Sequence, residues 1–233
     1  NEKCELQVGG SDQWGNIVLG ADLIRRKLGQ TAHALTWPLL TKPDGSKYGK
    51  TAGGETIWLS PEKMSPYRFY QAWISVDDSE VRKLLLQLTF LSPDEIDDLV
   101  AEHDQHPENR LGQRTLAKEL TAIVHGEQAA ASAVEASELL FEPSADISAV
   151  SESALEFISR EVPSTQTPTP QMAIIDCLVE TGLCQSRKDA KRAITEGGIY
   201  VNGDRVNEAE LSLTADHLLH GKYILLRRGK KLW

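Results

Sequence analysis

The stretch Glu5-Leu6-Gln7-Val8-Gly9-Gly10-Ser11-Asp12-Gln13 decides the fold of the first part of the chain. Its first four residues are typical of a short strand, and the two glycines mark a tight turn after it. Apolar residues then recur at helical spacing, as Ile17, Ala21, Ile24 and Leu28. Residues 32–37 form a second predicted strand. Strand, turn, helix and strand make a unit of an α/β sheet, and one unit cannot cover both faces of a sheet. We therefore expect more sheet to precede Asn1.

The same turn carries side chains suited to a nucleotide. Gly10 allows a close approach of the backbone to a ligand, and Asp12 can accept hydrogen bonds from ribose hydroxyls. Gln13 offers both a donor and an acceptor, and Gln7 is expected to point toward the same cleft. The alternative is a plain turn in which Ser11 or Asp12 caps the next helix, with no ligand.

A second candidate site lies in a polar, glycine-rich stretch, residues 40–55, which predicts a loop. Lys47 and Lys50 bracket Tyr48-Gly49, and Thr51 follows. Two ammonium groups at this spacing can converge on one polyanion, such as a leaving pyrophosphate, and stabilise its charge. The stretch is not a Walker A loop, because G-x-x-x-x-G-K-[ST] is absent from it. Taken alone, two lysines in a polar loop are more often solvated surface.

The middle of the chain is predicted to be helical from Ser60 to about Phe141. Ser60-Pro61-Glu62 and Ser92-Pro93-Asp94-Glu95 each place serine at an N-cap and proline at the first helical position. Residues 142–170 are rich in proline, serine and threonine, which predicts a linker with at most one short element around residues 155–158.

The last part, residues 171–233, is predicted to be a small α+β unit. Its first helix would carry Met172, Ile175 and Leu178, and a second would start at Ser186. Two strands follow, around residues 198–203 and 223–226, and Asn202-Gly203 is a strong signal for a hairpin turn.

The charge is distributed unevenly between this unit and the rest. The whole chain has a net charge of -9, but residues 171–233 hold ten Lys and Arg against eight Asp and Glu, a net charge of +2. One face of the helix after Ser186 is predicted to be basic, through Arg187, Lys188, Lys191 and Arg192. Its opposite face is apolar, so the helix predicts contact with an RNA backbone or, alternatively, an ordinary solvated face. Further basic candidates are Arg205, Lys222, Arg227, Arg228, Lys230 and Lys231.

Other classes of site are not favoured. The three cysteines and six histidines show no ligand spacing, so we expect no metal site and reduced thiols in a cytoplasmic protein. No apolar run approaches the ~18 residues of a membrane span, so we expect no membrane partner.

The motifs together resemble the class I aminoacyl-tRNA synthetases, and most closely the bacterial-type tyrosyl enzymes. Lys47-Tyr48-Gly49-Lys50-Thr51 resembles the K-M-S-K-S loop of that class, and residues 9–16 resemble the stretch before the same helix. Residues 66–74 are similar to the corresponding tyrosyl stretch, and residues 186–203 to an S4-like RNA-binding domain. Tryptophanyl enzymes share the first two motifs but lack such a tail.

The resemblance implies three parts. An α/β fragment, the end of a Rossmann-like catalytic domain, would cover residues 1–59, and an α-helical anticodon-side domain residues 60–141. After the linker at 142–170, a small α+β S4-like RNA-binding domain would cover residues 171–233.

The implied activity is tyrosine–tRNA ligation. L-tyrosine would react with ATP, accompanied by Mg²⁺, and the tyrosyl group would pass to the 3′ end of tRNA(Tyr) in a homodimeric enzyme. Lys47, Lys50 and Thr51 would be catalytic, and both lysines would bind ATP together with Gly10 and Asp12. Gln7 and Gln13 would line the tyrosine or adenylate pocket.

The chain also departs from the family pattern. Nothing in it matches the H-I-G-H-like signature or most of the tyrosine pocket, which belong to the first half of the catalytic domain. We therefore expect this chain to be a C-terminal portion that is inactive alone. Lys63-Met64-Ser65-Pro66 imitates the lysine loop, but Pro66 replaces the second lysine, so we interpret it as structural. A non-catalytic tRNA- or RNA-binding module is the alternative function.

Overall fold

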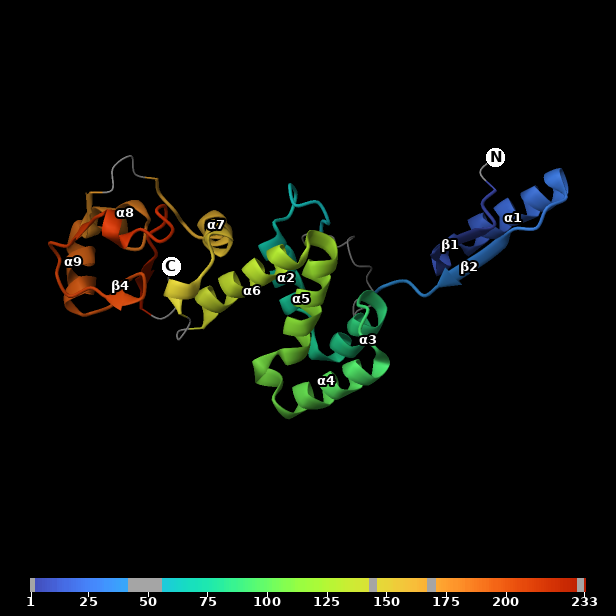
Figure 1. The fold of residues 1–233 in the computed structure, drawn as a ribbon, viewed down its shortest axis with the longest axis horizontal. Coiled ribbons are helices and arrows are strands. Elements are labelled where there is room, and N and C mark those ends of the chain that lie inside the picture. Colours follow the sequence, from blue (N-terminus) through green and yellow to red (C-terminus); the bar gives the residue numbers. More distant parts are fainter. Residues whose placement is uncertain (1–2, 42–55, 143–145, 167–170, 230–232) are drawn as a thin grey trace. The chain divides into compact units, whose positions relative to one another are not determined.

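The computed structural model describes residues 3–41, 56–142, 146–166, 171–229 and 233. The chain divides into two compact units, Asn1–Ile57 and Trp58–Trp233 (Figure 1). No described helix is both long and apolar enough to cross a membrane.

The first unit is the predicted strand–turn–helix–strand unit. Strand β1 (Leu6–Gly10) leads through a short 3-10 turn, η1 (Ser11–Gln13), into helix α1 (Trp14–Leu28), and strand β2 (His33–Trp37) follows. The two strands pair in parallel, from Leu6 opposite His33 to Gly10 opposite Trp37. Gly29 ends α1 in the left-handed conformation, with φ +64°, and its N–H bonds to the carbonyl of Arg25 at 3.0 Å.

This unit encloses little core among its described residues. Ile17 is its one buried apolar side chain there. Leu6, Val8, Leu35 and Trp37 are each about half exposed on the two strands, and Leu28, expected on the inner side of α1, is 62% exposed. Apolar side chains on both strands and on α1 are therefore exposed, because a single α/β unit cannot cover both faces of its sheet.

The second unit begins with a helix bundle. Its helices are α2 (Pro66–Ile74), α3 (Asp78–Leu88), α4 (Pro93–Gln105), α5 (Leu111–His125), α6 (Glu127–Phe141) and α7 (Glu152–Glu161). Helix α2 packs against α5 and α6 (Figure 1). Fully buried side chains such as Phe69, Leu84 and Leu116 fill the interior.

Of the two predicted N-caps, one is confirmed and one is wrong. Ser92 forms a capping box with Glu95, because each side chain accepts a hydrogen bond from the other residue's backbone N–H, at 3.3 and 2.8 Å. After Ser60 the chain makes only one turn, and the helix begins instead at Pro66. Ser65 is its N-cap and accepts a bond from the N–H of Arg68 at 3.2 Å. Pro66 is the reason, since its ring excludes a helical conformation at Ser65 and it has no N–H to continue the earlier turn.

The same finding supports a structural role for Lys63-Met64-Ser65-Pro66. Met64 is buried, and Ser65 and Pro66 start α2. Met64 therefore has a packing role, and Ser65 and Pro66 have a helix-starting role.

The segment between the bundle and the tail contains more structure than one short element. Helix α7 has ten residues, is capped by Ser151, and buries Ala154, Leu155 and Ile158. It packs against α6. An ion pair between Arg68 and Glu161, at 2.8 Å, joins it to α2.

The tail is a small α+β unit, as predicted. It contains β3 (Met172–Ala173), α8 (Ile174–Glu180), α9 (Arg187–Thr195), β4 (Ile199–Val201), β5 (Asp204–Arg205), β6 (Ser212–Leu213) and β7 (Leu226–Arg228). One sheet has the order β5-β4-β7 and is antiparallel, and β3 pairs with β6. The predicted hairpin turn is confirmed, because Asn202 and Gly203 both have positive φ between β4 and β5. Met172, expected on the first helix, instead belongs to β3, where it pairs with Leu213.

The three-stranded sheet has two distinct faces. The inner face carries Ile199, Val201 and Arg228, and its apolar residues join Ala190, Ala193 and Ile194 of α9 in one buried core. The outer face carries Tyr200, with Arg205 opposite it on β5 and Arg227 opposite it on β7. The consecutive arginines of β7 therefore point to opposite faces.

Candidate functional site

The predicted lysine loop lies outside the described residues. This applies to Lys47, Lys50 and Thr51, which belong to residues 42–55. The described part of the predicted nucleotide site is the turn between β1 and α1.

Both glycines of this turn lie close to neighbouring apolar side chains. A Cβ at Gly10 would lie 2.5 Å from Cδ2 of Leu39, and a Cβ at Gly9 would lie 3.1 Å from Cδ1 of Ile17. Gly10 has an ordinary extended backbone, with φ -70°. The glycine pair therefore allows α1 and the segment after β2 to pack closely on β1, whether or not a ligand is present.

The structure places Asp12 beside Gly10. It places Gln13 beside Gly9, on the face of β1 that also carries Gln7. Oδ1 of Asp12 lies 3.0 Å from the position of a Cβ on Gly10. Cβ of Gln13 lies 3.3 Å from the same position on Gly9, and Gln7 shares the face of Gly9 because side chains alternate along a strand. All three polar side chains belong to exposed residues.

The N-cap residues of η1 and α1 are Gly10 and Gln13, and neither makes a side-chain capping bond. Capping by Ser11 or Asp12 stays an alternative for this turn. Gln13 accepts a bond from Nδ2 of Asn16 at 3.1 Å through its carbonyl oxygen, which leaves its amide N–H₂ as the group that can still donate.

The basic helix of the tail has the predicted polarity. Ser186 caps α9 by accepting the N–H of Asp189 at 3.2 Å. The exposed face then carries Arg187, Lys188, Lys191 and Arg192, and the opposite face is buried.

These four cations are not equally available. Arg187 pairs with Asp176 of α8 at 2.9 Å, and Arg192 pairs with Asp189 at 2.9 Å. The ammonium groups of Lys188 and Lys191 have no hydrogen bond or ion pair to any residue in the described part of the chain. The two lysines thus keep their full charge for an outside partner, whereas each arginine is partly neutralised.

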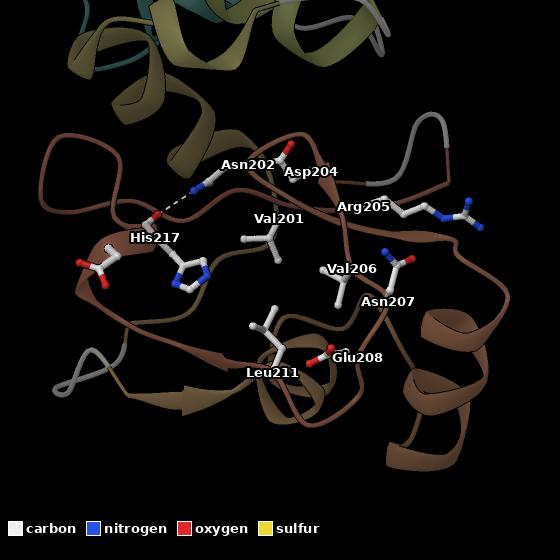
Figure 2. A pocket seen from close by; sticks show the side chains of 10 residues that line it. Val201, Asn202, Asp204, Arg205, Val206, Asn207, Glu208, Leu211 and His217 are labelled. Carbon is white, nitrogen blue, oxygen red and sulfur yellow. Dashed lines mark hydrogen bonds between the residues drawn. The ribbon is translucent and has the colours of Figure 1, made fainter.

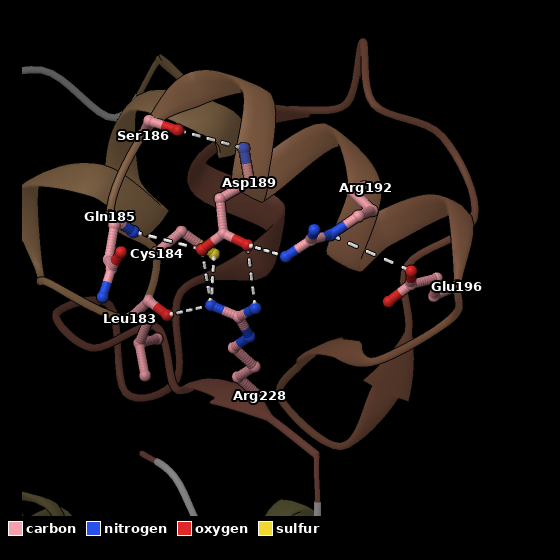
Figure 3. Close-up of polar contacts among 8 residues, drawn as sticks. All are labelled: Leu183, Cys184, Gln185, Ser186, Asp189, Arg192, Glu196 and Arg228. Atoms are coloured by element: carbon pink, nitrogen blue, oxygen red, sulfur yellow. Dashed lines mark hydrogen bonds and ion pairs between the residues drawn. The ribbon is translucent and has the colours of Figure 1, made fainter.

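Asp189 is the centre of a polar network under α9 (Figure 3). Its two oxygens accept bonds from both terminal nitrogens of Arg228, at 2.8 and 3.0 Å, and one of them also accepts the N–H of Gln185 at 3.2 Å. Arg228 donates further to the carbonyl of Leu183 at 2.9 Å. The hydrogen bonds from Arg228 lower the pKa of Asp189 from 3.8 to about 2. Arg228, a secondary RNA candidate, is therefore occupied in fixing α9 to β7.

The outer face of the sheet holds the other two arginines of interest. Arg205 lies over Gly197, and its Nη2 donates to the carbonyl of Glu196 at the end of α9, at 3.3 Å. Gly197 has φ +69° and no room for a Cβ beside this guanidinium. On the other side of Tyr200, Cζ of Arg227 lies 4.2 Å from the centre of the tyrosine ring. Tyr200 was not among the predicted site residues, although its place between buried Ile199 and Val201 shows the alternation that puts it on this face.

A pocket of about 380 Å³ lies beside the β4–β5 hairpin (Figure 2). Its polar lining includes the carboxylates of Asp204, Glu208 and Asp216 with one arginine, Arg205. The side chain of Asn202 is fixed by bonds to the carbonyl of His217, at 2.6 Å, and from the N–H of Leu225, at 2.9 Å. This acidic lining does not suit a phosphate group, so the pocket is a poor candidate for contact with an RNA backbone.

The described residues contain no group of three His, Cys, Asp or Glu side chains that could hold a metal ion. Cys177 and Cys184 are buried in the core of the tail, and burial raises the pKa of Cys177 to about 11. These two thiols are structural in character, because a thiol with a raised pKa is a poor nucleophile.

Two protein families match the chain in succession. Residues 2–142 match the family described as tRNA synthetases class I (W and Y). Residues 154–233 match the family described as the Tyrosine–tRNA ligase SYY-like C-terminal domain.

Curated relatives align with nearly the whole chain. Tyrosine–tRNA ligase of Geobacillus stearothermophilus is 47% identical over 231 residues, which are 99% of this chain and 54% of that protein. Tyrosine–tRNA ligase of Opitutus terrae is 45% identical over 235 residues, 99% of this chain and 55% of that protein. The chain thus spans about half the length of the curated relatives that it matches.

Among solved structures, a C-terminally truncated mitochondrial tyrosyl-tRNA synthetase of Coccidioides posadasii is similar, with 31% identity and a TM-score of 0.48. The match covers 56% of this chain and 38% of that one.

Proposed function

This chain belongs to the class I tRNA synthetases of the tryptophan and tyrosine group, and we propose that it is the C-terminal part of a tyrosine–tRNA ligase. The observation that carries this proposal is the order of the two family matches. The class I synthetase match is followed by a C-terminal domain described for tyrosine–tRNA ligases, and together they span residues 2–142 and 154–233. The second match favours tyrosine over tryptophan.

The proposed reaction has two steps. The carboxylate of L-tyrosine attacks the α-phosphate of ATP, which comes with Mg²⁺, and tyrosyl-adenylate and pyrophosphate form. The 3′-terminal ribose of tRNA(Tyr) then takes the tyrosyl group and releases AMP. In this scheme Lys47 and Lys50 stabilise the charge on the leaving pyrophosphate, and Thr51 adds a hydroxyl donor.

The β1–α1 turn is proposed to hold the adenylate. Gly10 and Asp12 would lie against the adenosine part, and Gln7 and Gln13 against the tyrosyl part. The position of Asp12 beside Gly10 and of Gln13 beside Gly9 supports this division, as does the amide N–H₂ of Gln13, which makes no hydrogen bond within the described part of the chain. Exposure of all three polar residues leaves them accessible to a ligand.

The tail is proposed to bind tRNA. Lys188 and Lys191 would make the main phosphate contacts, since they have no acidic partner in the described residues, and Arg187, Arg192 and Arg205 would contribute less. By its family membership, we further propose that the complete enzyme is a cytoplasmic homodimer.

The complete enzyme with Lys50→Ala tests the catalytic assignment. We expect ATP–pyrophosphate exchange to fall by about 100-fold or more, as is typical when a group that stabilises the transition state is removed. Binding of tRNA(Tyr) should change by less than about twofold, because Lys50 acts on the pyrophosphate. Lys63→Ala, in the Lys63-Met64-Ser65-Pro66 segment that resembles the lysine loop, is the matched control. It should leave ATP–pyrophosphate exchange and tRNA(Tyr) binding near those of the unchanged enzyme.

An alternative outcome would favour the non-catalytic RNA-binding module. In that case Lys50→Ala would leave pyrophosphate exchange unchanged, or the complete protein would show none. Loss of exchange with unchanged tRNA binding excludes that alternative.

A further inference from the structure

Arg227 differs from every other arginine in the described part of the chain. Each of the others has a hydrogen bond or an ion pair to a carboxylate or a backbone carbonyl, as Arg228 has to Asp189. Arg227 has none among the described residues, and its Nε is buried without a partner there. The guanidinium of Arg227 must therefore be held in its conformation by contacts other than hydrogen bonds to the described residues, and its N–H groups need another acceptor.

Two aromatic rings hold the guanidinium of Arg227 in place. Cζ of Arg227 lies 4.2 Å from the ring centre of Tyr200 on the neighbouring strand and 5.3 Å from that of Trp233. The indole N–H of Trp233 donates to the carbonyl of Leu140 at 3.0 Å, which holds the second ring in place. Both distances fall within the range in which a cation is attracted to an aromatic ring.

Stacking of this kind leaves the donors of arginine unused. A ring covers the flat face of the guanidinium, whereas its N–H bonds lie in the plane and point outward at the edge. Nε of Arg227 is buried, so the donors that remain for an outside partner are those of its two terminal nitrogens, which can form two parallel hydrogen bonds to the oxygens of a phosphate. No carboxylate of the described residues competes for Arg227, so its charge is not neutralised in advance.

We expect Arg227 to contact the same RNA backbone as the basic helix α9. Arg227, Tyr200 and Arg205 form one row across the outer face of the sheet. Arg205, at the other end of this row, reaches the carbonyl of Glu196 where α9 ends. The row therefore connects the outer face of the sheet with the C-terminal end of the basic helix.

We propose that Tyr200 is a positioning residue, which holds the guanidinium of Arg227 in the orientation that binds a backbone phosphate of the tRNA. The ring of Trp233 contacts the same guanidinium and contributes to its positioning. This inference rests on the proposed binding of tRNA by the tail. The ordering of the long arginine side chain before binding is what Tyr200 contributes, because a side chain already fixed loses less entropy when the complex forms.

A double-mutant cycle in the complete enzyme tests this role. Affinity for tRNA(Tyr) is measured for Tyr200→Leu, for Arg227→Gln and for the double variant, at two salt concentrations. We expect each single variant to bind about fivefold more weakly and the double variant to bind no more than about twofold more weakly than either one, because both changes remove the same interaction. Tyr200→Phe keeps the ring and should bind within about twofold of the unchanged enzyme.

Two further measurements separate the possible failures. Thermal unfolding of each variant shows whether Tyr200→Leu has damaged the tail, and Tyr200→Phe provides a ring-bearing variant if it has. Additive effects in the cycle, or full affinity in Tyr200→Leu, would overturn the positioning role. Lys188→Gln with Lys191→Gln serves as the control for the proposed function. If that double variant binds tRNA(Tyr) as tightly as the unchanged enzyme, the proposed contact of α9 with tRNA is wrong. If it binds more weakly while Tyr200→Leu binds normally, only the positioning role of Tyr200 is refuted.

Discussion

The two faces of the tail sheet use neighbouring arginines in opposite ways. On the inner face, Arg228 donates to both oxygens of Asp189 and fixes β7 to α9. On the outer face, Arg227 stacks on Tyr200 and has no acidic partner among the described residues. The two residues are adjacent in the sequence and chemically identical, and only the alternation of the strand separates them.

The difference shows that a basic side chain can bind RNA only if the fold has not already paired it with an acid. The same distinction divides α9, where Asp176 and Asp189 hold two arginines while two lysines have no partner in the described chain. Availability depends on which acids the fold brings near each cation. The number of positive charges in the tail therefore overstates the number of phosphates that the tail is expected to bind.

Arg228→Gln should have the largest effect, because it breaks the inner-face network. We expect the unfolding midpoint of the tail to fall by roughly 5–10 °C, a shift typical of a small domain from which a strong polar interaction is removed. Affinity for tRNA should fall with it, since α9 then loses its polar contacts with β7. Thermal unfolding followed by circular dichroism measures the change. A variant with unchanged stability would contradict a structural role for Arg228.

Acid should weaken the same network without any mutation. The pKa of Asp189 is lowered from 3.8 to about 2 in the folded chain, chiefly by the hydrogen bonds from Arg228. The stability contributed by this carboxylate is therefore present above about pH 4 and is lost as the pH falls toward 2. Unfolding midpoints measured across this range should show a smaller acid effect in Asp189→Asn than in the unchanged protein. Equal effects in both would show that Asp189 is not the group responsible.

Arg227→Gln should weaken tRNA binding without lowering stability, in contrast to Arg228→Gln. We expect an affinity for tRNA(Tyr) about fivefold weaker and an unfolding midpoint within about 2 °C of the unchanged protein, because the side chain has no polar partner among the described residues. A filter-binding assay beside thermal unfolding gives both quantities. A large fall in stability would instead assign Arg227 a structural role like that of Arg228.

Arg187→Gln and Arg192→Gln should have the smallest effects. Each arginine is exposed and already paired with an aspartate, so we expect each change to weaken tRNA binding by no more than about twofold. Lys188→Gln is the comparison on the same helix face, and it should weaken binding more than either arginine change. The reverse order would mean that the acidic partners release the arginines when tRNA binds.

Sequence patterns predicted the elements wherever the signal was local. Alternation, helical spacing and the Asn202-Gly203 turn indicated the strands, helices and hairpin close to their observed places. The failure at Ser60 has a local cause too, because the same Ser-Pro pattern occurs again at Ser65 and the second proline prevents a helix from running through it.

The state of each site residue depended on interactions that no sequence pattern contains. Asp176 and Asp189 neutralise cations eleven and three residues away, and the partner of Arg228 lies 39 residues before it. The predicted basic face of α9 is therefore confirmed as an exposed face, but the sequence did not show which of its cations are paired with acids. In the same way, no sequence pattern showed that Leu39 packs beside Gly10 and Ile17 beside Gly9.

The salt dependence of tRNA(Tyr) binding by the complete enzyme tests the central claim most directly. The unchanged enzyme is compared with the variant that combines Lys188→Gln and Lys191→Gln, and the logarithm of the binding constant is plotted against the logarithm of the salt concentration. The slope should become shallower by about two, one for each phosphate that a lysine no longer neutralises, and the midpoint of unfolding should not change. An unchanged slope would contradict the proposal that the tail binds tRNA through this face.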